Sequence, residues 1–571
     1  MKVKAGLAKK NWGVSEGQVR LSYWILLAFS LAITKIGVFC WNHAIQVPLV
    51  NWINDRSLYP QDPYMAVLAR YPFGMWSIVA LLARLFPLEG LLLVLFVLER
   101  LFVLYAVSRL ARVFAPRSGL AVVAATALFA FGLESMIGDG TIVALSFEHT
   151  MLATACILLG GAAFYERRPV DTAVWLGIGF ELTPMYGVFA LSYFGAVFVL
   201  DAEYRGEWKR WVRPFLLFLA LSSYAVYLSL VVTRGQSAVD PSWFTAALAR
   251  GSAHLYPWTW GLEPFARFGV FVALLAAVTF FVRREEPRLF RHGVIWSAVA
   301  VAWLLDAIAA AYVWHSPRLM MMQPVRAIDL LVCFGGIAMV SVAASKLDQY
   351  PAPSGRQGWL LALGASFAVW LVPGMRAVAV VLVIAALPPV WRRLAPLVSP
   401  RRLAGLLVAW VVVAGVNVAH VRWTESADVK QVVVRGPDVP TRELAAWAEK
   451  HTPLDAVFLL NASAEPDFDE FRALAKRSIF TSTNEGAGIY WAPEFVLEWT
   501  RRLNALGVKI EYRNVDSLDD DFDAAFTNLD DDHVLRLKEQ YRVSHWVVPG
   551  AHPSRFPVVW EGEEFKVLEV R

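Results

Sequence analysis

Residues 88–108 read LEGLLLVLFVLERLFVLYAVS. This stretch is apolar over nearly its whole length, and about 20 such residues suffice for a helix to cross a bilayer. Similar runs recur between residues 21 and 420. They decide the fold class before any motif is considered, because a soluble protein does not contain so many apolar runs of this length. The chain is predicted to be a polytopic α-helical membrane protein.

Composition and charge divide the chain into two parts. The 571 residues are 57% hydrophobic and 18% charged, whereas soluble proteins average about 25% charged residues. Residues 421–571 hold 18 basic and 27 acidic residues, and residues 1–420 hold 35 and 21. We therefore predict a transmembrane domain over 1–420 and a water-soluble α/β domain over 421–571. We expect membrane lipids, and no nucleic acid, among the partners.

The apolar runs predict about 13 transmembrane helices. Their expected bounds are 21–41, 88–108, 118–133, 149–165, 170–182, 184–200, 214–232, 265–282, 292–311, 326–345, 358–372, 374–391 and 403–420. Alternate loops are basic and together hold 24 Lys and Arg, which predicts a cytoplasmic N-terminus and an outer C-terminal domain. Pro184 should split the run 170–200. Residues 73–87 are expected to form an amphipathic helix in the outer interface.

The acidic C-terminal part alternates helix and strand patterns. A helix is predicted from Thr441, as N-cap, through 451, and another over 493–507 that ends near Gly507. Strands are expected at DAVFLL (455–460) and KRSIFTS (476–482). A helix followed by a strand covers 533–550, and a terminal hairpin turns at 561–562.

Two aspartates of the first outer loop are the first candidates for chemistry. Asp55 and Asp62 lie in NDRSLYPQDPY, and carboxylates near the bilayer surface can act as general bases or bind a cation. The alternative is turn formation, because Asp beside Pro is common in loops.

Further acidic residues and a histidine lie in or near the second outer loop. Asp139 stands between two glycines, which indicates a tight turn or the close approach of a ligand. Glu148 and His149 stand where the chain re-enters the membrane, as a proton-handling pair or as interfacial anchors. Glu181 lies within an apolar run beside the Pro184 break. We treat all four as substrate-binding candidates.

Basic and aromatic residues gather in the later outer loops. His315, Arg318 and Arg326 break the trend of basic residues inside, and arginine pairs well with phosphate. An ion pair between Arg326 and Asp329 is the alternative. His254, within SAHLYPWTWG (252–261), is a further substrate-binding candidate, although this aromatic segment is also typical of an interfacial belt.

Several stretches together resemble the GT-C superfamily of integral-membrane glycosyltransferases, in its bacterial branch. The first lies after the first helix, the second begins at the end of the fourth predicted span, and the other three lie in the C-terminal domain. These stretches are NHAIQVPLVNWINDRSLYPQDPY (42–64), AFYERRPVDTAVWLGIGFELTPMYG (163–187), TRELAAWAEKHTPLDAVFLL (441–460), FRALAKRSIFTS (471–482) and EFVLEWTRRLNALG (494–507).

The resemblance implies transfer of a sugar from a polyprenyl-phosphate donor to a glycan or lipid acceptor on the outer face of the membrane. In such enzymes an acidic residue of the first outer loop activates the acceptor, and basic residues of a later outer loop hold the carrier phosphate. Mapped here, Asp62 or Asp55 would be catalytic. Arg318 and Arg326, with His315, would hold phosphate.

The resemblance also implies a location in the cell, and it leaves the identity of any cofactor open. The expected location is the bacterial inner membrane, in the service of the cell envelope, with a periplasmic or extracellular C-terminal domain. The cofactor is unknown: a divalent cation is compatible with the chemistry, and no metal ligands are assigned.

Many family members carry an acidic pair directly after the first helix, where this chain has WNHAIQ (41–46).

Two other functions fit parts of the sequence. Glu181, Asp306 and Lys35 within apolar runs, together with the broken helix, would suit a transporter or flippase. A non-catalytic envelope assembly protein would use the outer domain to bind a partner.

Overall fold

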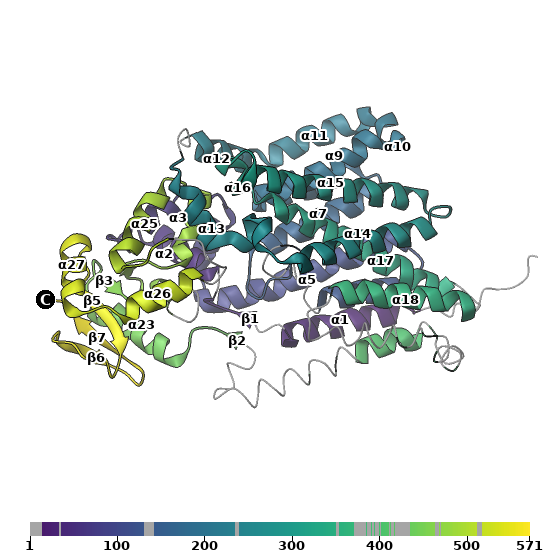
Figure 1. Cartoon of the computed structure of the whole chain (residues 1–571). Helices are drawn as coiled ribbons and strands as arrows, with labels where there is room; N and C mark the ends of the chain where they lie inside the picture. The colour runs from purple at the N-terminus through teal and green to yellow at the C-terminus, as the bar shows by residue number, and fades with distance from the viewer. Residues whose placement is uncertain are drawn as a thin grey trace, which may run out of the picture.

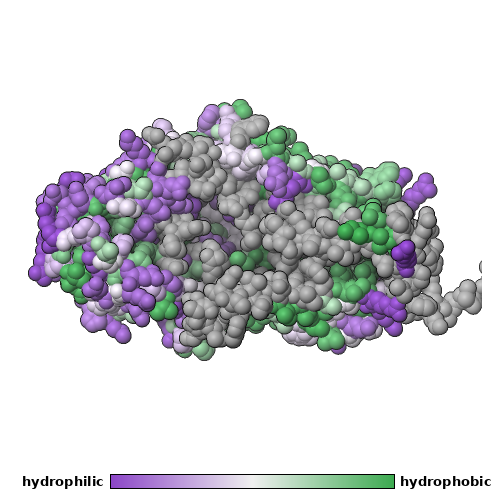
Figure 2. Space-filling model, turned by 60° about the horizontal axis from the view of Figure 1, so that its bottom comes forward, coloured by the Kyte–Doolittle hydropathy of each residue, from purple (hydrophilic) through white to green (hydrophobic). Residues whose placement is uncertain are grey.

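The computed structural model describes residues 14–33, 36–40, 42–130, 142–234, 239–349, 353–370, 401–409, 434–462, 470–510 and 517–571, with a few single positions between them. It shows a bundle of long helices with a smaller, strand-containing part at one end (Figure 1). Hydrophilic residues cover the strand-containing end, and hydrophobic patches lie over the helices (Figure 2). This distribution matches the two parts predicted from composition.

The helical bundle is called the membrane body below. Its main helices are α1 Glu16–Ile33, α5 Leu88–Phe114, α6 Gly119–Ala130, α7 His149–Tyr165, α8 Pro169–Leu182, α9 Pro184–Leu200, α11 Trp208–Leu221, α12 Ser223–Arg234, α14 Leu262–Phe281, α15 Pro287–Tyr312, α17 Ala327–Gln349 and α18 Pro353–Trp370. Shorter elements are α2 His43–Asn54, α3 Tyr64–Leu68, α4 Met75–Ala83, α10 Ala202–Gly206, α13 Ser242–Leu255, α16 Pro317–Met321 and the 3₁₀ turns η1 Pro257–Thr259 and η2 Pro324–Arg326.

Several of these helices can cross a membrane. Within the described residues, α5, α14, α15 and the segment Pro324–Asp348 are long and apolar enough, and α6, α7 and α9 are shorter apolar helices. The chain is thus a multi-pass membrane protein. The count of about 13 spans stays a prediction, because the runs 374–391 and most of 403–420 lie outside the described residues.

The breaks between helices have local causes. The predicted split at Pro184 is confirmed, since α8 ends at Leu182 and α9 begins at Pro184. The span predicted over 214–232 is broken: α11 and α12 are bent by 56° at Ser222, and together they are apolar enough to form one broken span. The Ser222 hydroxyl donates to the carbonyl of Phe218 at 2.9 Å, a kind of bond that often accompanies a bend.

Helix α17 forms the centre of the membrane body, and its apolar window is fully buried. It packs against α5, α6, α14, α15 and α18. Small residues make this possible, because a Cβ at Gly335 would come within 2.9 Å of the Phe271 ring of α14. Close backbone approach is the usual source of packing energy between membrane helices.

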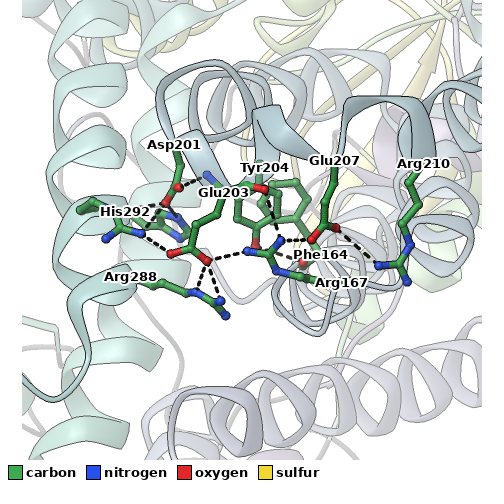
Figure 3. Close-up of polar contacts among 10 residues, drawn as sticks. Phe164, Arg167, Asp201, Glu203, Tyr204, Glu207, Arg210, Arg288 and His292 are labelled. Atoms are coloured by element: carbon green, nitrogen blue, oxygen red, sulfur yellow. Dashed lines mark hydrogen bonds and ion pairs between the residues drawn. The ribbon is translucent and has the colours of Figure 1, made fainter.

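Charged side chains at one end of the membrane body form what we call the paired network, seven residues bonded to one another. It consists of Arg167, Asp201, Glu203, Glu207, Arg288, Arg291 and His292 (Figure 3). The loops that supply them, after α7, after α9 and before α15, were predicted to share the cytoplasmic side. Their contact agrees with that alternation of loops. Which end faces the cytoplasm stays a prediction.

The C-terminal part is an α/β fold with a five-stranded sheet. The strand order is β4-β3-β5-β7-β6, with β3 parallel to β4 and β5 and the β5–β7–β6 portion antiparallel. The strands are β3 Val457–Leu459, β4 Ser478–Ile479, β5 His545–Pro549, β6 Val558–Glu561 and β7 Phe565–Glu569. The helices are α23 Val439–His451, α24 Phe471–Ala475, η4 Asn484–Tyr490, α25 Phe495–Leu506, α26 Ser517–Thr527 and α27 Asp531–Tyr541.

Most sequence predictions for this part are confirmed. The two predicted strands, the terminal hairpin and the stop of α25 at Gly507, which adopts φ 97°, are all present. The predicted N-cap Thr441 is wrong, since Asp438 caps α23 by accepting from the backbone N–H of Thr441 at 2.8 Å. Asp at an N-cap satisfies the same free N–H groups that a threonine would.

The C-terminal part joins the membrane body through the segment that follows α1. Strand β1 (Ile36–Gly37) pairs in parallel with β2 (Val434–Arg435). One hydrophobic core contains residues of 36–96 together with residues of 457–570. The division at 420/421 lies outside the described residues, so the domain boundary stays a proposal.

Candidate functional site

The segment 144–148, just before α7, is held by a charged pair from α5. Glu99 Oε2 accepts from the backbone N–H of Glu148 at 2.8 Å, and Arg100 Nη2 donates to the carbonyl of Ala144 at 2.6 Å. Both side chains are 1% exposed. Charges at this depth are costly unless bonded, and here they fix the backbone of the 144–148 loop.

Two residues of the first outer loop complete this support. His43 Nδ1 accepts from the N–H of Phe39 at 3.1 Å, so its Nε2 carries the proton that faces the carbonyl of Phe147 at 3.2 Å. Burial lowers the pKa of His43 to about 4, which keeps this tautomer neutral. Beside it, Asn42 Nδ2 donates to Glu148 Oε1 at 2.8 Å. The Glu148 carboxylate is therefore presented in one orientation.

The environment of Glu148 suits proton transfer. Burial raises the pKa of this carboxyl, and the bond from Asn42 and the positive charge of Arg326 oppose the shift. A carboxylate whose pKa moves toward neutrality is a better general base than an exposed one. Glu148 is thus able to take a proton from a hydroxyl placed beside it.

His149 lies in an aromatic enclosure next to Glu148. Its Nδ1 accepts from Trp76 Nε1 at 3.4 Å, and its ring centroid lies 4.1 Å from that of Phe73 and 6.1 Å from that of Tyr71. Tyr71 in turn packs on Trp491 of the C-terminal part at 4.9 Å. Both parts of the chain therefore border the same region.

Two cations come from other segments, and the helix that carries one of them, α13, packs against both η2 and η4. Arg326, at the end of η2, is close enough to lower the pKa of Glu148. Burial raises the pKa of Tyr490 in η4 to about 12, and the charges of Arg250 and Arg326 oppose that rise. Arg250 of α13 also donates to the side chain of Asn484. We call Glu148, Arg250, Arg326 and Tyr490 the Glu148 site.

Asp62 lies elsewhere, in a buried ionic cluster. It is 6% exposed; its Oδ1 accepts from the N–H of Tyr64 at 3.0 Å and its Oδ2 from Arg472 Nε at 2.7 Å. Arg472 also donates to Glu485, which accepts from Thr481 Oγ1 at 3.0 Å. The polar contacts of Asp62 thus lead to the C-terminal part.

Asp55 is exposed and closes a turn. Its Oδ1 accepts from the N–H of Ser57 at 2.9 Å and from its hydroxyl at 2.6 Å, and these bonds lower the pKa of Asp55. This is the Asx-turn geometry that the sequence left open as the alternative. The catalytic roles predicted for Asp55 and Asp62 stay predictions.

The remaining candidates are dispersed. Glu181 accepts from the backbone N–H of Ala225 at 3.0 Å and so ties α8 to α12. The His315 ring lies 5.8 Å from that of Phe244, and Arg318 belongs to α16. Asp139 and the side chain of His254 lie outside the described residues. The structure thus brings together Glu148, His149 and Arg326.

Asn42, His43, Glu99, Arg100, Arg250 and Tyr490 were missed from the sequence. Only Glu99 and Arg100 carried a usable signal, because adjacent charges within an apolar span call for partners. Among the described residues, no group of three or more His, Cys, Asp or Glu could hold a metal ion.

Comparisons with known proteins match one segment of the chain to a sequence family and most of the chain to a solved structure. Residues 439–506 match a family model described as a domain of unknown function, DUF6798. No curated protein matches. The crystal structure of ArnT from Cupriavidus metallidurans in the apo state is similar over 97% of this chain and 98% of that chain, with 14% identity and a TM-score of 0.44. ArnT is a GT-C glycosyltransferase, but likeness at this level supports no statement about activity here.

Proposed function

We propose that the chain is a GT-C-type membrane glycosyltransferase that moves a sugar from a polyprenyl-phosphate donor to a glycan or lipid acceptor. One observation carries the proposal: the charge of Arg326 acts on the Glu148 carboxyl, and α13, which carries Arg250, packs against both η2, which ends at Arg326, and η4, which ends at Tyr490. A base and a cation pair on the same end of the membrane body are what transfer from a sugar phosphate requires.

The proposed chemistry assigns each group a role. Glu148 accepts the proton of the acceptor hydroxyl. The oxygen of that hydroxyl forms a bond to the anomeric carbon of the sugar. The bond from that carbon to the phosphate oxygen breaks, and the electron pair leaves on the phosphate. Arg250 and Arg326 neutralise the negative charge of that leaving group, a task for which the guanidinium fork is well suited.

The burial of the cations supports this assignment. Arg250 Nε and Arg326 Nε are both buried and have no hydrogen-bond partner in the part of the chain that the structure describes. Buried N–H groups are normally satisfied. An anionic ligand between the two arginines would supply acceptors for both.

A transfer assay tests the proposal directly. Purified full-length protein is given a radiolabelled polyprenyl-phosphate sugar and a membrane extract as the acceptor source, and labelled glycan or lipid product is measured. Glu148→Gln is expected to abolish transfer, and Arg326→Ala to reduce it strongly. Glu181→Gln is the control, because that carboxylate accepts from the backbone N–H of Ala225 and joins α8 to α12. Full activity in Glu148→Gln would remove the mechanism.

The same preparation separates the alternatives. Reconstituted in vesicles, a transporter or flippase would move the lipid-linked sugar across the bilayer without forming product. Asp62→Asn and Asp55→Asn are assayed alongside. Loss of transfer in either one, with Glu148→Gln active, would return the base role to the first outer loop.

A further inference from the structure

The C-terminal part reaches the Glu148 site through η4, which has the sequence NEGAGIY (484–490). Trp243 Nε1 of α13 donates to the carbonyl of Ile489 at 3.2 Å, and Arg250 of the same helix donates to Asn484. Both ends of η4 are therefore bonded to α13. This helix precedes the membrane-spanning α14 and supplies one of the two cations of the site.

No room is left between η4 and its neighbours. A Cβ added at Gly486 would come within 2.8 Å of Arg250 Cγ, and one at Gly488 within 2.7 Å of Val67 Cγ1. The two glycines thus let η4 pack against α13 and the first outer loop at once. The position of η4 relative to the membrane body is fixed by these contacts.

A buried ionic clamp reinforces this position. We use this name for Asp62, Arg472 and Glu485, in which Arg472 donates to carboxylates of the first outer loop and of η4. Arg472 and Glu485 are each 2% exposed. Removing one member of such a cluster leaves an uncompensated buried charge. The clamp therefore ties η4 to the first outer loop, in addition to the bonds between η4 and α13.

The tyrosine at the end of η4 has an unused polar atom. The Tyr490 hydroxyl is buried without a hydrogen-bond partner among the residues that the structure describes, as are Arg250 Nε and Arg326 Nε. These three atoms come from η4, α13 and η2, and the two guanidinium groups both act on the tyrosine electrostatically. Because α13 packs against both η2 and η4, a hydroxyl at the end of η4 is well placed to donate to an anion that the two cations bind.

We infer that the C-terminal part completes the substrate site: Tyr490 donates a hydrogen bond to the phosphate that Arg250 and Arg326 hold, and the Asp62–Arg472–Glu485 clamp positions it. The inference rests on the proposed function for the nature of the ligand. It gives the segment matched as a domain of unknown function a definite task, because Arg472, Glu485 and Tyr490 all lie within 439–506. Asp62 then acts as a positioning residue.

Equilibrium binding to the full-length protein in detergent tests this inference. The probes are a long-chain polyprenyl monophosphate, the matching alcohol and inorganic phosphate. Wild type should bind the monophosphate well above both others. Tyr490→Phe should weaken that binding about tenfold, the effect of losing a hydrogen bond to a charged group. Tyr541→Phe is the matched control, because it removes another buried hydroxyl without a partner in the described structure from the core of the same domain.

The possible failures are distinguishable. Tyr490→Phe binding like wild type, with Arg326→Ala defective, would overturn the inference and leave the proposed function standing. Wild type binding the alcohol as well as the monophosphate would overturn the proposed function itself. Equal binding of inorganic phosphate would show a site for a free anion and overturn the assignment to a lipid phosphate.

A double-mutant cycle tests the clamp. Arg472→Lys keeps the buried charge but cannot donate to both carboxylates in the same fork. It should weaken binding of the monophosphate several-fold in wild type and have no further effect in Tyr490→Phe, because the clamp acts through the tyrosine. Additive losses would contradict the positioning role, and the Tm of each variant in detergent separates loss of folding from loss of binding.

Discussion

The two ends of the membrane body use charged side chains differently. In the paired network, Arg291 donates to both Asp201 and Glu203. Both ring nitrogens of His292 are bonded, one to Asp201 at 3.0 Å and one to Tyr165 at 2.8 Å. The network has one buried donor without a partner among the described residues, Arg167 Nε, whereas the Glu148 site has three: Arg250 Nε, Arg326 Nε and the Tyr490 hydroxyl.

This difference separates structural charges from functional ones. Charges bonded to one another hold loops together and need nothing further. Buried donors left open lower stability unless a ligand supplies the acceptor. Mutations should therefore affect stability at the first end and activity at the second, and each prediction below tests that division.

The largest effect is expected at Glu148. Replacement by Gln keeps the shape and the bond from Asn42 but removes the base, so transfer should fall about 10³-fold, at the scale of general-base catalysis. The Tm in detergent should change little. A drop in Tm of several degrees with activity retained would mean that Glu148 serves structure, as the paired network does.

The next effect is expected at His292, which is fully buried. His292→Ala removes its bonds to Asp201 and Tyr165 and leaves a cavity, and this should cost about 3 kcal/mol of stability. Transfer per folded molecule should stay near wild type. Arg210→Ala, at a half-exposed pair with Glu207, is the control and should be nearly silent. If His292→Ala lost transfer with an unchanged Tm, the paired network would serve activity, and the proposed division between structural and functional charges would be wrong.

A smaller effect is expected at Glu99, which accepts from the backbone N–H of Glu148. Glu99→Gln can still accept that bond, whereas Glu99→Ala leaves the buried N–H without an acceptor and loosens the 144–148 loop. Transfer should therefore fall about tenfold or less in Glu99→Ala and stay near wild type in Glu99→Gln. Equal losses in the two variants would contradict the positioning role of Glu99, and the Tm of each variant separates loss of folding from displacement of Glu148.

The smallest effect is expected at the exposed pair Arg112–Glu16, whose atoms lie 2.7 Å apart. Exposed pairs contribute about 1 kcal/mol or less and weaken in salt. Arg112→Ala should lower the Tm slightly at low ionic strength and leave transfer unchanged. A large loss of stability would show that isolated surface pairs matter as much as the buried network.

Local patterns in the sequence predicted the helices well. The span 149–165 coincides with α7, and the strand, hairpin and Gly507 signals of the C-terminal part are present. These features depend on neighbours a few residues apart. The bend at Ser222 was missed, because a serine hydroxyl that bonds back to its own helix leaves no trace in the apolar pattern.

The site was harder to predict because its contacts are long-range. Glu148 and Arg326 were among the candidates, but Asp62 was favoured as catalytic, and its partner Arg472 is 410 residues away in the chain. The burial that raises the pKa of Glu148 likewise comes from folding rather than from its neighbours in sequence. Besides Glu148 itself, the charged pair Glu99–Arg100 was the sequence signal that pointed to the 144–148 loop.

The pairing of β1 with β2 has a consequence for biogenesis. Ile36 emerges from the ribosome long before its partner Val434, a delay of roughly 20–80 s at about 5–20 residues per second. Throughout that interval the newly inserted helices stand without the strand that anchors the segment after α1. The protein therefore cannot complete its fold while it is being translated, and a chain released before β2 would lack η4 as well.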